Sequence, residues 1–480
     1  MNAESHTLNR ELNSRMLNMI AIGGSIGTGI FLASGHAIYI AGPGGTLLAY
    51  LITGVMVYFL MTSLGEMAAF MPTTGSFYIY AAKFVDPALG YALGWNYWYN
   101  WAITVASEIS AASLIMHFWL PESPSFIWCT IFLTLVVGFN ALSAKGFGET
   151  EYWFSFIKVA VIVLFIIGGL AIVFGATTYQ AGGFKNWTIG DAPFHGGWFA
   201  IVSAFMIAGF SFQGTELLGI AAGESKNPRE NLPKAIKQVF WRILLFFVLS
   251  IFIISLLVPY TSTQLVNSDV EMSPFTLVLK QYGITFAASI VNGVILIAIL
   301  SAGNSGMYAA TRMLWYLAKK GHVPAIFSKV TRRGVPLNAL IATTLIAMLA
   351  FLSSLFGNGK VYFWLINASS LSGFIAWLGI AISHYRFRKA YLMQGKPLHD
   401  LPYVAKGYPI APIIATALCL IVIAGQNIHA LMLDQIDWHG LLVSYIGLPA
   451  FLILWLGYKW KKNTKIIKLE ACNFDYEKTF

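Results

Sequence analysis

Charged side chains are scarce in this sequence of 480 residues. Asp, Glu, Lys and Arg together make up 10 %, against about 25 % in an average soluble protein. Hydrophobic residues reach 57 %, aromatic residues 15 %, and the mean hydropathy is +0.69. No stretch is polar enough to link two soluble domains. The composition excludes a soluble protein and predicts an all-α polytopic membrane protein.

Cysteine frameworks, metal-ligand spacings and nucleotide motifs are also missing. The three cysteines lie far apart, and the nine histidines show no ligand spacing. Gly24–Gly29 is not a Walker motif, because no Lys-Ser/Thr follows it. Residues 16–40 are too long for a cleavable signal peptide and lack a small-residue cleavage site. We therefore expect no metal, no organic cofactor and no enzymatic activity.

Long apolar runs occupy most of the chain. A bilayer core about 30 Å thick requires roughly 20 apolar residues in a helix, and by that criterion we expect about twelve spans. They are placed at residues 16–40, 45–69, 88–118, 125–144, 153–175, 197–223, 241–260, 283–318, 338–357, 361–385, 409–431 and 439–458.

Basic residues gather on one side of these spans. With a cytoplasmic N-terminus, 26 of the 30 Lys and Arg residues lie in cytoplasmic segments or the adjoining helix ends. The outer loops hold only Lys185, Lys280 and Lys360. The net charge of +10 is thus spread over many short loops and forms no patch for nucleic acid. We expect two cytoplasmic termini, a surround of membrane lipid and no nucleic-acid partner.

The first expected span contains four glycines in the segment Gly23-Gly24-Ser25-Ile26-Gly27-Thr28-Gly29. Glycine removes side-chain packing and weakens a helix locally. One interpretation is a close helix–helix contact at small residues. The other is an unwound segment whose backbone N–H and C=O groups bind a ligand, which is tolerated only where it lines a cavity.

The sixth expected span has a similar interruption, Gly209-Phe210-Ser211-Phe212-Gln213-Gly214-Thr215-Glu216. Spans one and six correspond if the first ten spans form two inverted five-span repeats, and paired interruptions of this kind point to a transporter binding site. Half-helix N-termini would face a carboxylate and exposed carbonyls an ammonium, which suits an amino acid. The predicted divisions are a tail at 1–15, repeats at 16–175 and 197–388, two extra helices at 409–460 and a tail at 461–480.

Several motifs carry a family resemblance: Gly23–Gly29, Gly65-Glu66 with Met71–Ser76, Gly94–Trp98, Gly209–Glu216, and Ser301–Gly306 through Arg312. With them the chain resembles the amino acid–polyamine–organocation superfamily, and within it the bacterial amino acid permeases. The stretches Phe212–Glu216 and Ser372–Arg388 look closest to lysine-specific permeases. The resemblance implies a fold with helices 1 and 6 broken, and a secondary transporter in the bacterial inner membrane. It would import L-lysine, with the proton as coupling ion, by alternating access.

Ionisable side chains at membrane depth cost about 2.5–3.5 kcal/mol each on insertion scales, so each is a functional candidate. Glu108, Lys158 and Glu216 lie inside expected spans, whereas Glu66 and Glu224 lie nearer cytoplasmic ends. For Glu66 we expect a snorkelling side chain or a structural ion pair.

Glu216 directly follows the second interruption, so its carboxylate is expected to face the cavity. Three roles stay open: binding a substrate's side-chain ammonium, carrying the coupling proton, or pairing with another buried polar group. Glu224 lies about 12 Å further along the helix axis. It suits a gate or secondary site on the cytoplasmic path, or a cap or partner for Lys226.

One face of the third span is both aromatic and polar, and lipid would not tolerate its polar members. The face is formed by residues at spacings of three and four, which are Tyr97, Asn100, Trp101, Thr104 and Glu108. We interpret it as cavity lining, with its two aromatic residues near the substrate.

Lys158 lies about six residues, or roughly 8 Å, into the fifth span from its cytoplasmic end. One interpretation is a snorkelling lysine whose ammonium reaches the interface. The resemblance implies another, because in proton-coupled relatives a fifth-span lysine stands where sodium-coupled members hold sodium. There it would tie this span to carbonyls of the first interruption, near Glu108, and loss of its charge would couple protonation to opening.

The expected site therefore has two parts. Backbone groups of the first interruption would hold the substrate carboxylate, carbonyls near Ile22 and Phe212 its α-amine, and Phe212 would be an aromatic gate. The substrate-binding residues are Ile22, Ser25, Ile26, Gly27, Thr28, Gly29, Tyr97, Trp101, Phe212, Thr215 and Glu216, and the coupling or gating residues are Glu108, Lys158 and Glu224.

Other functions stay open. A channel would carry rings of like residues from several subunits, whereas this chain has one asymmetric polar cluster. Related permeases for arginine, aromatic or neutral amino acids share most of the motifs. A transporter that also senses lysine through a membrane-embedded partner is a further alternative, with the acidic outer segment around Asp269 and Glu271 as the contact.

Overall fold

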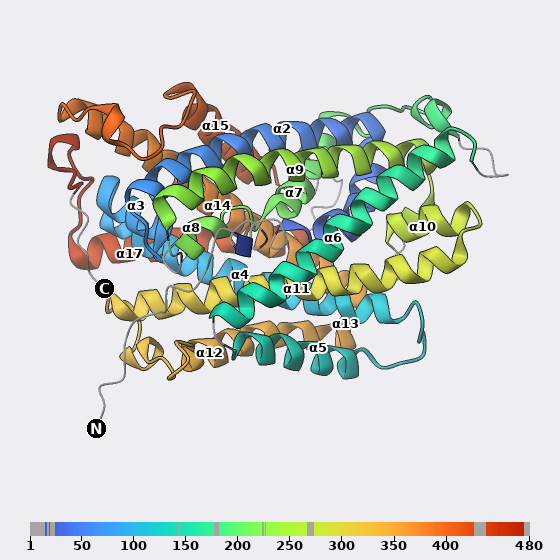
Figure 1. Ribbon diagram of the computed structural model, residues 1–480, viewed down its shortest axis with the longest axis horizontal. Coiled ribbons are helices and arrows are strands. Elements are labelled where there is room, and N and C mark those ends of the chain that lie inside the picture. Colours follow the sequence, from blue (N-terminus) through green and yellow to red (C-terminus); the bar gives the residue numbers. More distant parts are fainter. Residues whose placement is uncertain are drawn as a thin grey trace.

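The computed structural model describes residues 15, 16, 19, 25–142, 144–176, 182–222, 225, 227–265, 273–426 and 438–474. The regular elements of these residues are helices, and the longer ones run mostly along the long axis of the molecule (Figure 1). The expected all-α class is confirmed for the described part of the chain.

The first long helix, α2 (Ser34–Phe70), is kinked near its start at Gly42 and Pro43. Gly42 has a φ of +72°, and a Cβ there would lie 2.8 Å from the carbonyl oxygen of Pro193. That carbonyl accepts a hydrogen bond from the Gly44 N–H at 2.8 Å. The kink divides the helix into two arms at the positions expected for the first two spans.

The other helices follow in chain order. In the first part of the chain they are η1 (Gly29–Ala33), α3 (Ser76–Phe84), α4 (Pro87–Met116), α5 (Ser125–Asn140), α6 (Ala144–Val173), η2 (Gly183–Trp187), α7 (Gly197–Phe212) and α8 (Leu217–Ala221). In the second part they are α9 (Pro228–Leu257), η4 (Thr263–Leu265), α10 (Pro274–Gln281), α11 (Thr285–Lys319), η5 (Ala325–Ser328), α12 (Leu337–Ala347), η6 (Met348–Leu352), α13 (Ser353–Phe356), α14 (Asn358–Met393), η7 (Leu398–Asp400), α15 (Ile410–Gly425), α16 (Trp438–Tyr445), α17 (Gly447–Lys462) and η9 (Leu469–Ala471).

Six helical segments among the described residues are long and apolar enough to cross a membrane: Gly29–Phe70, Gly148–Val173, Gly197–Ala221, Thr285–Lys319, Leu337–Phe356 and Gly359–Met393. Two helices begin earlier than the expected spans, α6 at Ala144 instead of 153 and α9 at Pro228 instead of 241. Hydropathy marks only the apolar part of a helix, and both helices start with polar turns. The earlier start of α6 brings a further glutamate, Glu151, into the helix.

The centre of the molecule is formed by α4, which packs against both α11 and α14. The arms of α2 pack against α7 and α9, and these three helices lie together along one side (Figure 1). Three tryptophans, Trp101, Trp315 and Trp377, are almost completely buried. The glycine-rich end of α7 packs against the core of the molecule, since a Cβ on Gly209 would overlap the ring of Phe374.

One end of the bundle is held by ion pairs. Arg388 of α14 donates from Nε to Glu66 at 2.6 Å and also from Nη2, and the N–H of Ala405 donates to Glu66 at 2.6 Å. Glu66 is fully buried, so the expected structural ion pair is confirmed and a snorkelling side chain is excluded in this structure. At the same end Lys459 of α17 donates to Asp86 at 2.7 Å.

Candidate functional site

The first interruption lies where it was predicted. Ile26 and Gly27 are not helical, and a short π-helix, η1, follows from Gly29. A Cβ on Gly29 would lie 2.5 Å from the Cα of Ser211, and one on Gly27 would lie 2.8 Å from the Cβ of Ala302. The segment thus departs from helical geometry and also packs closely against α7 and α11. Ile22, with Gly23 and Gly24, lies outside the described residues.

The second interruption separates α7 from α8. Phe212 ends α7, and Gly214 has a φ of +99°, a left-handed conformation that suits glycine. The Thr215 hydroxyl donates to the Phe212 carbonyl at 3.1 Å, which leaves that carbonyl partly engaged. Leu217 then begins α8. The two glycine-rich segments meet directly at the contact between Gly29 and Ser211.

A small cavity lies between the two interruptions and the faces of α4 and α11. Its volume is about 10 Å³, which leaves room for only about one water molecule. An amino acid could therefore enter only if lining side chains moved. The lining residues are Ser25, Gly27, Gly29, Trp101, Thr104, Glu108, Phe210, Gln213 and Ala302.

Glu108 is the carboxylate in this cavity. Its Oε1 accepts from the Thr28 hydroxyl at 3.0 Å and from the Thr28 N–H at 3.5 Å. Its Oε2 has no hydrogen-bond partner among the described residues. Tyr362 of α14 donates to the Thr28 carbonyl at 3.4 Å. The Glu108 carboxylate thus accepts a hydrogen bond from the Thr28 N–H, one of the backbone donors at the start of η1.

Glu216 does not line the cavity. It is separated from the lining residue Trp101 by Tyr97. Its carboxylate accepts from Trp377 Nε1 at 3.2 Å, from the Gly214 N–H at 3.1 Å and from the Tyr97 hydroxyl at 3.4 Å. The Tyr97 ring is 6.2 Å from the ring of Trp101, which lines the cavity. Of the two aromatic residues expected to line the cavity, Trp101 does so, whereas Tyr97 lies between Trp101 and Glu216.

The aromatic side chain that α7 contributes to the cavity is Phe210, not Phe212. The Phe212 ring is fully buried beside Tyr50 and Phe247, at centroid distances of 6.2 and 4.9 Å. In this structure the position expected for Phe212 as a gate is therefore taken by Phe210. Residues 210 and 212 point to different sides of the helix, and the sequence spacing could have separated them.

Two polar residues at the site were not singled out from the sequence. Gln213 lines the cavity, and its amide exchanges hydrogen bonds with Ser369 of α14, Nε2 donating to the carbonyl at 3.2 Å and Oε1 accepting from the hydroxyl at 3.2 Å. Thr104 and Ser369 hydroxyls are 2.6 Å apart. The position of Gln213 inside an interruption was the available signal. Ser369 was not singled out, because it is one of several small polar residues in the run Asn367-Ala368-Ser369-Ser370-Leu371-Ser372.

Lys158 is completely buried in α6, which excludes a snorkelling side chain in this structure. Its Nζ lies 3.9 Å from Oε1 of Glu151, and it acts electrostatically on Glu108 as well. The expected neighbourhood of Lys158 and Glu108 is thus present. Glu151 was missed because the fifth span was expected to begin only at residue 153.

Three of the residues predicted from the sequence cannot be placed in the structure. Glu224, Asp269 and Glu271 lie outside the described residues. Ser25 lines the cavity, and Ile26 is buried beside it. Among the described residues, no group of three or more His, Cys, Asp or Glu side chains is arranged to hold a metal ion.

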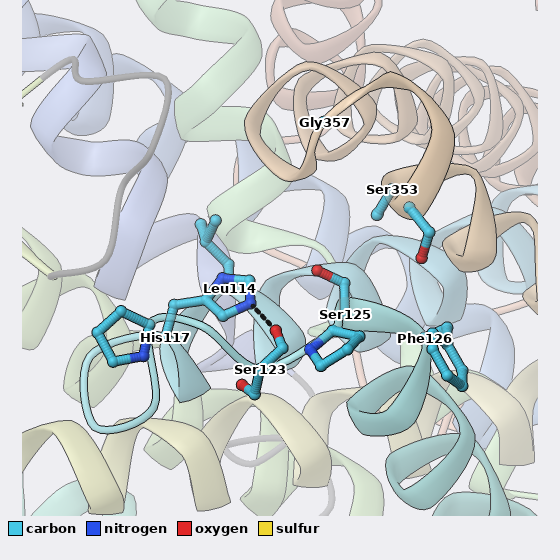
Figure 2. Close-up of a pocket in the computed structure, with 10 residues that line it drawn as sticks. Leu114, His117, Ser123, Ser125, Phe126, Ser353 and Gly357 are labelled. Atoms are coloured by element: carbon cyan, nitrogen blue, oxygen red, sulfur yellow. Dashed lines mark hydrogen bonds between the residues drawn. The ribbon is translucent and has the colours of Figure 1, made fainter.

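A larger hollow of about 540 Å³ lies between the end of α4, the start of α5 and the α13–α14 connection (Figure 2). His117 contacts the carbonyl of Ser123 at 3.0 Å there. Its lining is made of serines, prolines and apolar residues, without a carboxylate. Of the two cavities, the central one is therefore lined by a carboxylate, that of Glu108, whereas the described residues around this hollow supply none.

The family model for amino acid permeases matches residues 17–471. The chain belongs to this family. The permease is therefore a multi-pass membrane transporter and not an enzyme in the catalytic sense. It is 56 % identical over 475 residues to the lysine-specific permease LysP of Escherichia coli (strain K12), covering 98 % of this chain and 97 % of that protein.

Two further relatives come from Lactococcus lactis subsp. cremoris (strain MG1363). The permease is 51 % identical to its lysine-specific permease LysP, with 98 % of this chain and 93 % of that protein covered. It is 49 % identical to the histidine permease HisP, with 98 % of both chains covered. The resemblance stated from the sequence motifs is confirmed.

Proposed function

We propose that the permease imports L-lysine together with protons across the bacterial cytoplasmic membrane by alternating access. Its similarity to two proteins named lysine-specific permeases supports lysine as the substrate. The observation that carries the proposal is Glu216, a buried carboxylate surrounded by aromatic side chains one helical turn beyond the cavity.

The distances suit a lysine side chain. Trp101 lines the cavity and Tyr97 contacts Glu216, and these two residues are four apart in α4, about 6 Å along the axis. A four-carbon side chain with an ammonium at its tip covers a similar length. With the amino acid head in the cavity, the ammonium would reach Glu216 among Tyr97 and Trp377, whose rings also favour a cation.

The head group is assigned to the interrupted helices. The N–H groups of Gly27, Thr28 and Gly29 at the start of η1 suit a carboxylate. Carbonyls near Ile22 and Phe212 suit the α-amine. Glu108 already accepts from the Thr28 N–H, so the substrate carboxylate would displace it. Protonation of Glu108 would ease that exchange, which links proton binding to lysine binding.

Lys158 supplies the other half of the coupling. It is buried close to Glu108 and Glu151, so its charge affects both carboxylates. In the protonated form it would hold α6 against the first interruption. Loss of the proton would weaken that contact and permit the inner side to open.

The proposed topology has twelve spans, with inverted repeats at 16–175 and 197–388 and both termini in the cytoplasm. The two arms of α2 and the breaks before η1 and after α7 support it. A cavity of about 500 Å³ lies on the same faces of α2 and α7 further along, lined by His36, Ser203 and Met206. It suits an outer entry route, because Met206 is one turn from Phe210.

Histidine is the second candidate substrate, favoured by the similarity to the histidine permease. A histidine side chain is shorter than that of lysine and would reach Glu216 less well. Uptake of radiolabelled lysine into proteoliposomes, in competition with histidine, arginine, phenylalanine and alanine, distinguishes these substrates. We expect uptake driven by an acidic exterior, its loss with a protonophore, and competition mainly by lysine.

Glu216→Gln tests the ammonium site directly. Loss of a charged hydrogen-bond partner costs about 1.5–3 kcal/mol, so lysine affinity should fall roughly tenfold to a hundredfold. Norleucine has the same four side-chain carbons without the ammonium, and we expect its competition to change little. Equal losses for both ligands, together with an altered pH dependence, would assign Glu216 to the proton pathway instead.

A further inference from the structure

We propose that Glu151 is a second proton-binding carboxylate, which takes the coupling proton from Lys158 and passes it to the cytoplasmic side. The proposal rests on the proposed proton-driven uptake. It is carried by the position of Glu151, by its incomplete hydrogen bonding and by the charges around it.

Glu151 and Lys158 lie on the same face of α6. They are seven residues apart, two helical turns, and their charged atoms approach to 3.9 Å. Both side chains are completely buried. Because α6 starts at Ala144, Glu151 lies between Lys158 and the end of the helix assigned to the cytoplasm. It is therefore the next ionisable group on the inward path.

Glu151 is only half satisfied. The Ser301 hydroxyl of α11 donates to Oε1 at 2.6 Å, while Oε2 has no hydrogen-bond partner among the described residues. Asn304 and Ser305 of the same helix also act on this carboxylate, and Asn304 Nδ2 and Ser305 Oγ have no hydrogen-bond partner there either. A carboxylate kept only for structure would be expected to use both oxygens, since an unmade buried hydrogen bond is costly.

The charges around Lys158 do not balance. Two buried carboxylates, Glu108 and Glu151, face one buried ammonium. An uncompensated buried charge is expensive, so the cluster is most stable when it holds one extra proton. Glu108, Glu151 and Lys158 then share one extra proton, and this proton can move from one of the three groups to another.

Glu151 and Glu108 act electrostatically on Lys158, and the helices that pack against α6 carry other charged residues as well. On α6 itself Glu149 pairs with Arg15 at 3.1 Å, and α5 has no acidic or basic residue. Those with described side chains are Arg312 and Lys319 on α11, and Arg229, Glu230 and Lys234 on α9, where all three are exposed.

The step conserves protons and charge. The Lys158 ammonium gives one proton to the Glu151 carboxylate, which leaves a neutral amine and a carboxylic acid. A small rotation of either side chain brings the two atoms from 3.9 Å to hydrogen-bond distance. The acid then releases its proton toward the cytoplasm, and Lys158 is reprotonated through Glu108 from the cavity side.

Glu151→Gln is the test, because it keeps the size of the side chain and an acceptor for Ser301 but cannot take a proton. The matched control is Glu149→Gln, two residues away and 43 % exposed. Each variant is measured in proteoliposomes for lysine–lysine exchange without a gradient and for accumulation driven by a pH gradient. We expect Glu151→Gln to reduce accumulation at least tenfold more than exchange, and Glu149→Gln to match the wild type in both.

A purely structural Glu151 gives a different result. Exchange and accumulation would then fall together and their ratio would stay at the wild-type value, whereas a proton-binding role predicts a lowered ratio that Glu151→Asp partly restores. Normal accumulation by Glu151→Gln overturns the proposal. If wild-type uptake ignores the pH gradient, the proposed function itself fails, which the same assay shows separately.

Discussion

Two regions of the permease bury carboxylates in opposite ways. At the end of the bundle Glu66 is fully paired, with Arg388 and the Ala405 N–H sharing its two oxygens. In the centre Glu108 and Glu151 each leave one oxygen without a hydrogen bond among the described residues. Their shared cation is a lysine, Lys158.

The partners explain the difference. An arginine stays protonated in proteins, so its pair with Glu66 can only hold structure. A buried lysine can release its proton, so the central cluster has more than one charge state. Full pairing with arginine indicates a fixed contact, whereas the proposed coupling requires the contact between Lys158 and the two carboxylates to change during transport.

The largest expected effect is on Lys158. Lys158→Ala should abolish proton-driven uptake while the protein still inserts, because the cation between the two carboxylates is gone. Lys158→Arg keeps a charge that cannot be released, so it should bind lysine but transport poorly. Uptake and binding of both variants in proteoliposomes check this. A fully active Arg variant would make the central cluster equivalent to the Glu66–Arg388 pair and break the comparison.

The second effect is on stability. Arg388→Ala removes the cation that pairs with Glu66 and leaves a buried charge, which costs about 3–5 kcal/mol. We expect a large drop in the thermal unfolding temperature of the protein in detergent. Lys389→Ala is the control, since this neighbour is exposed and only faces the Tyr385 ring at 5.7 Å. Equal stability of the two variants would show that the paired carboxylate is not structural.

The sequence predicted the centre of the molecule better than its details. Glycine clusters locate the two interruptions because few other residues produce a break inside an apolar helix. The three-and-four spacing on α4 identified an inward face, and Trp101, Thr104 and Glu108 do line the cavity. Both signals come from residues that are neighbours in the sequence, so they can be recognised without knowledge of the fold.

Contacts between distant segments could not be predicted in the same way. Nothing near Glu216 in the sequence shows that Trp377 of α14 donates to it, and nothing near Gln213 indicates Ser369. Glu151 was missed for another reason, because hydropathy places helix ends only within a few residues. The expected span began at residue 153, so an error of two residues placed Glu151 outside the membrane and left it out of the buried carboxylates.

The smallest expected effect concerns Asp86, a paired carboxylate outside the membrane-spanning helices. Burial alone would raise its pKa. The Lys459 ammonium, the Ala88 N–H and the Thr464 hydroxyl outweigh burial and hold the pKa of Asp86 below its usual value. Asp86 also caps the N-terminus of α4. Asp86→Asn removes the charge but keeps a good cap, whereas Asp86→Ala removes both.

Because the pKa of Asp86 is lowered by folding, its contribution is complete above the pKa of the unfolded chain, near 3.8, and is lost as pH falls through the lower folded value. We expect Asp86→Asn to cost at most about 1 kcal/mol at neutral pH, since Lys459 is partly exposed. Asp86→Ala should cost about 1 kcal/mol more through the lost cap. Unfolding temperatures of wild type and Asp86→Asn should converge as the pH falls below 3.8. A constant difference across that range would mean that the charge of Asp86 contributes nothing, and that even a fully paired carboxylate at this end acts through its hydrogen bonds alone.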